Sequence, residues 1–123
     1  MANHYTALVL DEASRVLLAK LFKPRHARVF LDHVTLEFEP TAPVDKEFRG
    51  FARVTGYAED GAGQALECTV DFAANSVRAP SQRTHITVST AKDVPPQYTK
   101  GMEFKPLSYS VVVCGVVRTV ERD

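Results

Sequence analysis

Alternation of apolar and polar residues with a period of two is the feature that most restricts how this 123-residue chain can fold. Successive side chains of a strand point to opposite faces of a sheet, so alternating runs predict strands that turn one face toward a core. Only one stretch has helical periodicity instead. The sequence therefore predicts an α+β protein with largely antiparallel pairing and few helices. The strand-like runs are residues 4–10, 33–38, 48–58, 65–72, 85–90 and 109–121.

The helical stretch follows the first strand directly and spans residues 12–22. Asp11 is the expected N-cap, because its carboxylate can accept a hydrogen bond from a backbone N–H of the first turn. Pro24 ends the helix. Between the third and fourth strands, Asp60-Gly61 predicts a hairpin turn. The Pro-containing segment 91–106 is expected to be a long loop with room for one helical turn.

Charge and cysteine content limit the functions that the chain can have. Fifteen basic residues balance fifteen acidic ones, which argues against general nucleic-acid binding through many phosphate contacts. Cys68 and Cys114 show no CxxC spacing, and both are expected to be free, buried thiols in strands. The apolar run 111–117 is too short to span a bilayer, and no signal peptide is visible. We expect one domain, residues 1–123, in a reducing cytoplasmic setting.

One four-residue motif occurs twice, at residues 33–36 and 85–88. Its order is histidine, apolar residue, threonine, apolar residue. In a strand, the histidine and threonine of each copy project to one face while the apolar residues project to the other. If the two strands are neighbours, two imidazoles and two hydroxyls converge. The four polar residues are His33, Thr35, His85 and Thr87.

Such a set suits chemistry at a phosphoester. One imidazole can act as general base and the other as general acid, and the hydroxyls can bind phosphate oxygens on which charge changes. Neither a metal nor a covalent nucleophile is required. The competing interpretation is that these are ordinary half-exposed strand residues, since threonine is common in strands.

The paired motifs resemble the signature of the two-histidine (2H) phosphoesterase superfamily. THITVSTAKDVPPQYTK, residues 84–100, looks like the second motif region of the cyclic phosphodiesterase domains of fungal-type tRNA ligases. HYTALVLDEASRVLL, residues 4–18, is similar to the opening strand and helix of that group. The resemblance implies a two-lobed fold of mainly antiparallel sheets with a central cleft. It also implies hydrolysis of a 2′,3′-cyclic phosphate to a 2′-phosphate, with the two histidine–threonine pairs as catalytic residues.

Three further residues are candidates for substrate binding. Tyr98 follows the second motif, and its ring could stack on a base, although packing is the commoner role of a loop tyrosine. Tyr5 could line the same groove, and Arg83 could assist phosphate binding or be ordinary surface charge. The expected partner is an RNA 3′ end or a cyclic nucleotide, with no membrane, metal or cofactor. The oligomeric state stays open.

Two other functions agree with the same residues. The first is a phosphodiesterase acting on cyclic oligonucleotide signals or on 2′-5′ linked RNA. The second, from a different class, is a module that binds RNA ends without catalysis. Binding alone needs no acid–base pair, so turnover of a cyclic nucleotide distinguishes this module from an enzyme.

Overall fold

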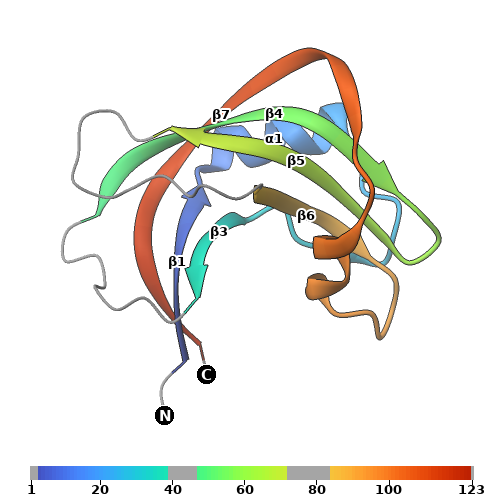
Figure 1. Ribbon diagram of the computed structural model, residues 1–123, viewed down its shortest axis with the longest axis horizontal. Helices are drawn as coiled ribbons and strands as arrows, with labels where there is room; N and C mark the ends of the chain where they lie inside the picture. Colours follow the sequence, from blue (N-terminus) through green and yellow to red (C-terminus); the bar gives the residue numbers. More distant parts are fainter. Residues whose placement is uncertain (1–2, 39–46, 72–83, 123) are drawn as a thin grey trace.

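The computed structural model describes residues 3–38, 47–71 and 84–122 (Figure 1). Strands dominate this part of the chain, which contains one α-helix and one 3₁₀ helix. The expectation of a mainly antiparallel protein with few helices is therefore confirmed. In chain order the elements are β1 (Asn3–Leu10), α1 (Glu12–Leu21), β2 (Arg28–Val29), β3 (His33–Phe38), β4 (Phe48–Glu59), β5 (Gly63–Asp71), β6 (Thr84–Thr90), η1 (Pro96–Gly101) and β7 (Lys105–Arg122).

All described strands belong to one sheet, ordered β2-β6-β3-β1-β7-β4-β5, and every pairing in it is antiparallel. A further pairing between β5 and β6 closes six of these strands into a barrel, while β2 lies outside the ring. Strands from the two halves of the chain interleave, because β3 pairs with β6 and β1 pairs with β7. The described strands thus form one continuous sheet instead of two separate ones.

Most strand boundaries agree with the alternating runs, and the exceptions lie where alternation is weak. β7 begins at Lys105, inside the stretch expected to be loop, because Lys105 and Pro106 pair with Tyr57 and Gly56 of β4. The strand β2 has only two residues, too few for a period to be recognised. The helical turn expected between β6 and β7 is present as η1.

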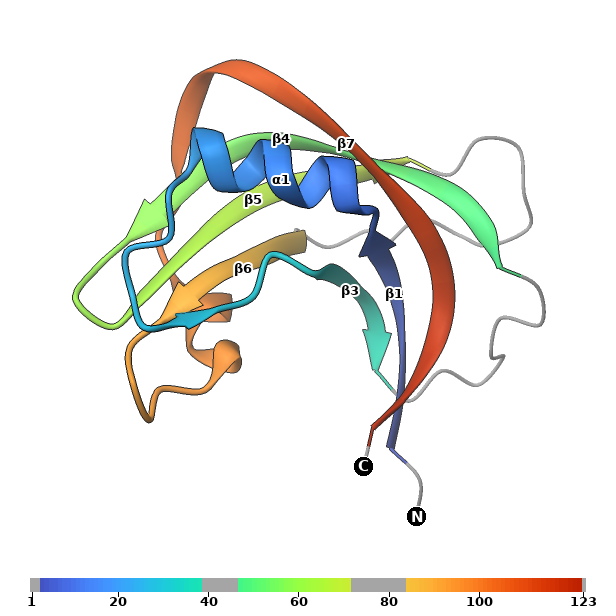
Figure 2. The ribbon, with the colours of Figure 1, turned by 180° about the vertical axis from the view of Figure 1, so that it is seen from behind.

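The core lies on one face of the sheet and contains buried side chains from all six barrel strands. Helix α1 adds Leu18 and Phe22 to this core, and the ring of Phe22 stacks on Tyr57 of β4. The neighbouring helix positions Leu17 and Leu21 remain 40% and 45% exposed. Seen from behind, α1 lies across the barrel between β4 and β7 on one side and β3 and β6 on the other (Figure 2).

Asp11 begins α1 as expected, because its carboxylate accepts a hydrogen bond of 2.8 Å from the backbone N–H of Ser14. This bond holds the pKa of Asp11 below its ordinary value. The side chain of Ser14 is buried and accepts a hydrogen bond from the backbone N–H of Cys114, which fixes the helix to β7. Both cysteines are free, but only Cys68 is buried as expected, whereas Cys114 is half-buried. Burial raises the pKa of the Cys68 thiol to about 11.

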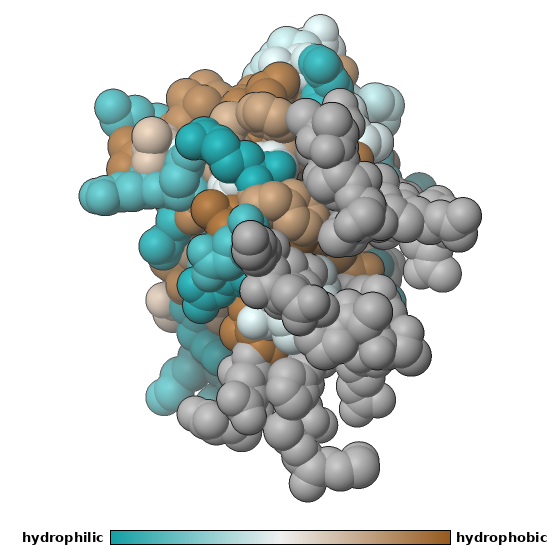
Figure 3. Space-filling model, turned by 90° about the vertical axis from the view of Figure 1, so that its left-hand side faces the viewer, coloured by the Kyte–Doolittle hydropathy of each residue, from teal (hydrophilic) through white to brown (hydrophobic). Residues whose placement is uncertain are grey.

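A smaller apolar cluster lies where η1 and the start of β7 pack against the hairpin of β4 and β5. It contains Ala58, Ala65 and Met102, with Phe104 packed against it. Elsewhere the outer face of the sheet reaches the surface, and apolar and hydrophilic residues intermingle on the side shown in Figure 3. Among the described residues, no helix is long and apolar enough to cross a membrane.

Candidate functional site

The two histidine–threonine motifs lie on neighbouring strands, because β3 pairs with β6 through Val34 and Ile86. In an antiparallel pair, the residues on either side of this position oppose one another crosswise. Thr35 therefore lies beside His85, and His33 lies beside Thr87. Each imidazole has the hydroxyl residue of the other copy as its neighbour across the strands.

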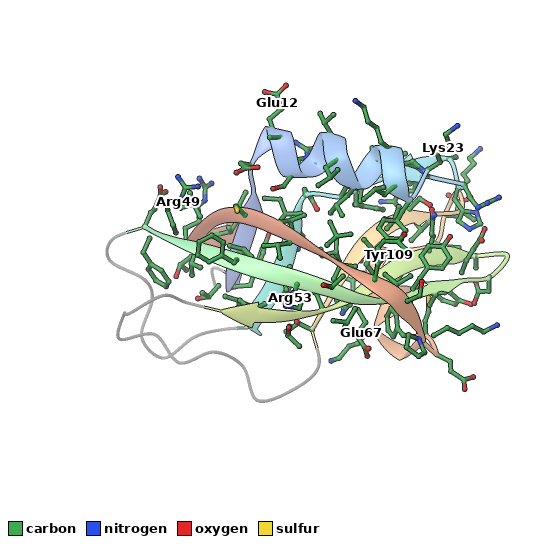
Figure 4. All side chains as sticks on the ribbon, turned by 90° about the horizontal axis from the view of Figure 1, so that it is seen from above. Glu12, Lys23, Arg49, Arg53, Glu67 and Tyr109 are labelled. Carbon is green, nitrogen blue, oxygen red and sulfur yellow. The ribbon has the colours of Figure 1, made fainter. Side chains whose placement is uncertain are left out.

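The four polar side chains project away from the core. Val34 and Ile86 are fully buried and belong to the core, so the alternate positions on each strand point to the opposite face. All four polar residues are half-buried. Glu67 of β5, which pairs with His85, lies on the side of the sheet opposite α1 (Figure 4).

His33 has two close neighbours, a carboxylate and an aromatic ring. Its Nδ1 lies 2.9 Å from Oδ1 of Asp32. The ring of Tyr5, from β1, has its centroid 5.4 Å from that of the imidazole, with the ring planes tilted by 43°. The small, fully buried Ala7 lies between Tyr5 and the β1 residue that pairs with His33, which leaves room for this approach. The structure thus brings Tyr5 to the first motif.

Asp32 carries a negative charge beside His33. Partial burial alone would raise the pKa of this carboxyl, since it disfavours the charged form. The hydrogen bond and charge of His33, together with the charge of Arg15, outweigh burial and hold the pKa of Asp32 below its ordinary value. Asp32 is therefore ionised at neutral pH and acts only as a hydrogen-bond acceptor.

The backbone immediately before this pair has an unusual conformation. Leu31 has a φ of 57°, in the left-handed region that branched residues rarely occupy. Its backbone N–H donates to the carbonyl of Thr87 at 2.9 Å, and its carbonyl accepts from Nε of Arg15 at 3.2 Å. The buried Leu31 side chain adds a third restraint. This turn interrupts strand alternation, so the side chains of Asp32 and His33 can meet although they are adjacent in sequence.

A row of side chains crosses five strands on the face that carries the motifs. Reading across the sheet, Arg118 pairs with Ala7, Ala7 pairs with Thr35, Thr35 lies beside His85, and His85 pairs with Glu67. Arg118 stands at the cationic end of the row, and its side chain is 49% exposed. It lies 3.7 Å from Glu47 in an exposed ion pair, which is a weak contact.

The hydroxyl of Thr87 is hydrogen-bonded to η1, the helix that follows β6. It lies 2.9 Å from the hydroxyl of Thr99 in η1. Thr99 donates its own proton to the carbonyl of Pro96, so Thr87 is the donor in the first bond. Thr99 is fully buried. Among the described residues, the side chain of Thr35 has no such bond, so the two motif hydroxyls are not equivalent.

Tyr98 lies next to Thr99 in η1 and packs against the start of β5. Its hydroxyl donates to Oδ2 of Asp60 at 2.7 Å, and its ring packs so closely on Gly63 that a Cβ there would come within 2.9 Å. Gly63 and Glu67 are four residues apart on β5, which corresponds to about 13 Å along a strand. The residue is 43% exposed, and its role in base stacking stays a prediction.

Sequence reasoning overlooked Asp32, Glu67 and Arg118. The first could have been noticed, because an aspartate directly precedes the first histidine in LDHVT. The other two depend on strand pairing between distant segments, for which the sequence holds no local signal. Arg83, the expected phosphate-binding residue, lies outside the described residues. Within the described part of the chain, no three metal-binding side chains gather into a group.

Comparison of the chain with protein-family models, with curated proteins and with solved structures found no match. The chemistry of the site must therefore be argued from its own residues. These are two imidazoles, a hydroxyl and a cation from strands β3, β6 and β7, together with a carboxylate from the turn before β3 that is bonded to one imidazole.

Proposed function

We propose that this chain is a metal-independent phosphodiesterase that hydrolyses 2′,3′-cyclic phosphates at RNA or nucleotide ends, as a member of the 2H phosphoesterase superfamily. The observation that supports this most is the antiparallel pairing of Val34 with Ile86. That pairing sets both histidines on one face of neighbouring strands. From the resemblance to tRNA-ligase domains, the proposed product is the 2′-phosphate.

The reaction needs two proton transfers at opposite sides of the phosphorus. A neutral imidazole takes a proton from water as the oxygen attacks, and a protonated imidazole gives one to the ribose 3′ oxygen as the P–O3′ bond breaks. Unperturbed histidine titrates near pH 6.5, so both forms are accessible around neutrality. His33 and His85 are diagonal neighbours, typically about 7–8 Å apart, which leaves room for a phosphate between them.

Negative charge on the phosphate oxygens requires donors and a cation. Thr35 is the better placed hydroxyl, because it lies beside His85 and has its proton available, whereas Thr87 donates to Thr99. Arg118 stands two strands from Thr35 in the same row, with only the small Ala7 between them. A long guanidinium side chain can extend across that position toward a bound phosphate.

Two further expectations belong to this proposal, one about the shape of the fold and one about the cellular setting. One is a division into two lobes around a central cleft, which in this chain would run within a continuous sheet. The other is a reducing cytoplasmic setting, which accords with two free cysteines. Cyclic oligonucleotides and 2′-5′ linked RNA are alternative substrates for the same acid–base pair.

A substrate screen tests the proposal. The protein is incubated with nucleoside 2′,3′-cyclic phosphates, cyclic dinucleotides and 2′-5′ oligoadenylates in excess chelator, and products are identified by ³¹P NMR. We expect turnover of the 2′,3′-cyclic phosphates to 2′-phosphates, undiminished by chelator. Loss of activity that added metal restores would contradict the mechanism. Saturable binding of these ligands without any turnover would identify a non-catalytic binding module instead.

A further inference from the structure

We propose that Asp32 is the positioning residue for His33, holding the imidazole so that Nε2 is the atom that exchanges protons with the substrate. The inference rests on the proposed function for its kinetic consequence and on geometry for the rest. Asp32 would not touch the substrate. It would act through His33 alone.

The tautomer of His33 follows from the chemistry of its partner. An ionised carboxylate can only accept hydrogen bonds, so Nδ1 of His33 must carry the hydrogen in the 2.9 Å contact with Asp32. The lowered pKa of Asp32 supports the ionised form at neutral pH. In neutral His33 the lone pair then resides on Nε2, and proton gain and loss occur there.

The surroundings fix the orientation as well as the tautomer. Tyr5 packs against one side of the imidazole, and Thr87 lies beside it across the strands. Asp32 itself is held by its backbone carbonyl, which accepts from the N–H of Leu10 at 2.9 Å. The left-handed turn at Leu31 brings the carboxylate round to the histidine. Strained backbone that its surroundings enforce is a known property of functional sites.

The charged and titratable groups around the Asp32–His33 pair come from four elements. Tyr5 is contributed by β1, Arg15 by α1, Asp32 by the turn before β3, and His85 by β6. Within the described ranges, Asp32 is the one residue that is hydrogen-bonded to the imidazole. The proposal therefore concerns one contact, which a single substitution removes.

His26 provides a control within the same molecule. Its Nε2 lies 3.0 Å from the backbone carbonyl of Asp60, and a carbonyl can only accept. Neutral His26 must therefore carry its hydrogen on Nε2, the tautomer opposite to that of His33. Two histidines of one protein are thus expected to show opposite tautomers for the same physical reason.

The first test is long-range ¹H–¹⁵N NMR of the imidazoles at a pH where they are neutral. In the wild-type protein we expect the Nδ1–H form for His33 and the Nε2–H form for His26. Asp32→Ala should shift His33 toward Nε2–H and leave His26 unchanged. Asp32→Asn should keep the Nδ1–H form, because the amide oxygen still accepts, and it serves as the second variant if alanine prevents folding. Nε2–H at His33 in the wild-type protein, or no response to Asp32→Ala, would overturn the proposal.

The second test is steady-state kinetics on a nucleoside 2′,3′-cyclic phosphate. Asp32→Ala should lower kcat by about 10- to 100-fold, by analogy with the range known for residues that orient metal-binding histidines. KM should change little, because Asp32 does not contact the substrate. An unchanged kcat in a variant whose tautomer has shifted would refute the positioning role. If the wild-type protein shows the expected tautomers but no turnover, the Asp32–His33 contact stands and the proposed function fails.

Discussion

The motif at residues 33–36 and its copy at 85–88 lie side by side in the sheet, yet their polar side chains contact different neighbours. In the first copy, the histidine is bonded to Asp32 and packed against Tyr5. In the second, the threonine is bonded to Thr99 and connects β6 to η1. The two threonine hydroxyls thus differ: that of Thr87 is bonded to Thr99, whereas that of Thr35 has no such bond among the described residues.

This difference separates the properties of a motif that depend on its own residues from those that depend on distant segments. Alternation along a strand decides which face a side chain takes, and both copies follow it. Segments that are distant in sequence decide what the side chain then meets. Equal sequence patterns therefore need not have equal chemical roles, and substitutions at matching positions of the two copies should have unequal effects.

The largest expected effect on stability concerns the apolar half of the second copy. Ile86 is fully buried in the core beneath both motifs, so Ile86→Ala should reduce the free energy of unfolding by about 2–5 kcal/mol. Urea unfolding measures the loss. Val112→Ala is the matched control, since Val112 is a strand residue with 48% exposure and should change stability by less than about 0.5 kcal/mol. Equal effects of both substitutions would contradict the assigned core.

The two threonines should differ in their effect on catalysis. Thr35→Ala should lower the rate of cyclic phosphate hydrolysis by about 10- to 10³-fold, because it removes a hydrogen bond to the phosphate. Thr87→Ala should lower it less than about tenfold, because the hydroxyl of Thr87 is already bonded to Thr99. The corresponding serine variants should restore most of each loss. A larger loss at Thr87 than at Thr35 would reverse the comparison.

Stability should show the opposite order. Thr87→Val keeps the shape of the side chain but removes the bond to Thr99, and should cost about 0.5–1.5 kcal/mol of unfolding free energy. Thr35→Val should leave stability within about 0.5 kcal/mol of the wild-type value, because the Thr35 hydroxyl has no hydrogen bond to lose among the described residues. Thermal or urea unfolding of the two variants provides the measurement. Identical losses would show that the hydroxyls are equivalent after all.

The smallest expected effect is at Tyr98, whose ring packs on Gly63 at the start of β5. Its hydrogen bond to Asp60 is the first cause of the lowered pKa of that carboxyl. A carboxyl whose pKa is lower in the folded protein than in the unfolded chain, where it is about 3.9, stabilises the fold at pH values above about 3.9. This stabilisation is lost as the pH falls through the pKa of the folded state. Tyr98→Phe should therefore lower Tm slightly at pH 6–7, with the difference shrinking as the pH falls below the unfolded value. A difference independent of pH would contradict this role.

Much of the fold could be predicted from local pattern. The alternation gave β3 its correct limits, Asp11 caps α1, and Asp60 forms the hairpin turn by accepting from the N–H groups of Ala62 and Gly63. The placement of both motifs on neighbouring strands agreed with the expectation. These features depend on a few consecutive residues, whose conformational preferences are readable in the sequence.

The rest depends on contacts between distant segments. The bond between Thr87 and Thr99 requires η1 to fold back on β6, and the row from Arg118 to Glu67 requires the closed order of the strands. The left-handed Leu31 is also unreadable in sequence, because glycine is the residue expected there. These are the features that separate the two copies.

The measurement that tests the central claim most directly is a double-mutant cycle on His33 and His85, with a nucleoside 2′,3′-cyclic phosphate as substrate. If the two imidazoles act on one phosphate, each single alanine variant should lose about 10²- to 10⁴-fold in rate. The double variant should lose less than the product of the two, because the pair works as a unit. Folded single variants that both keep near wild-type activity would contradict the account and return both histidines to ordinary strand residues.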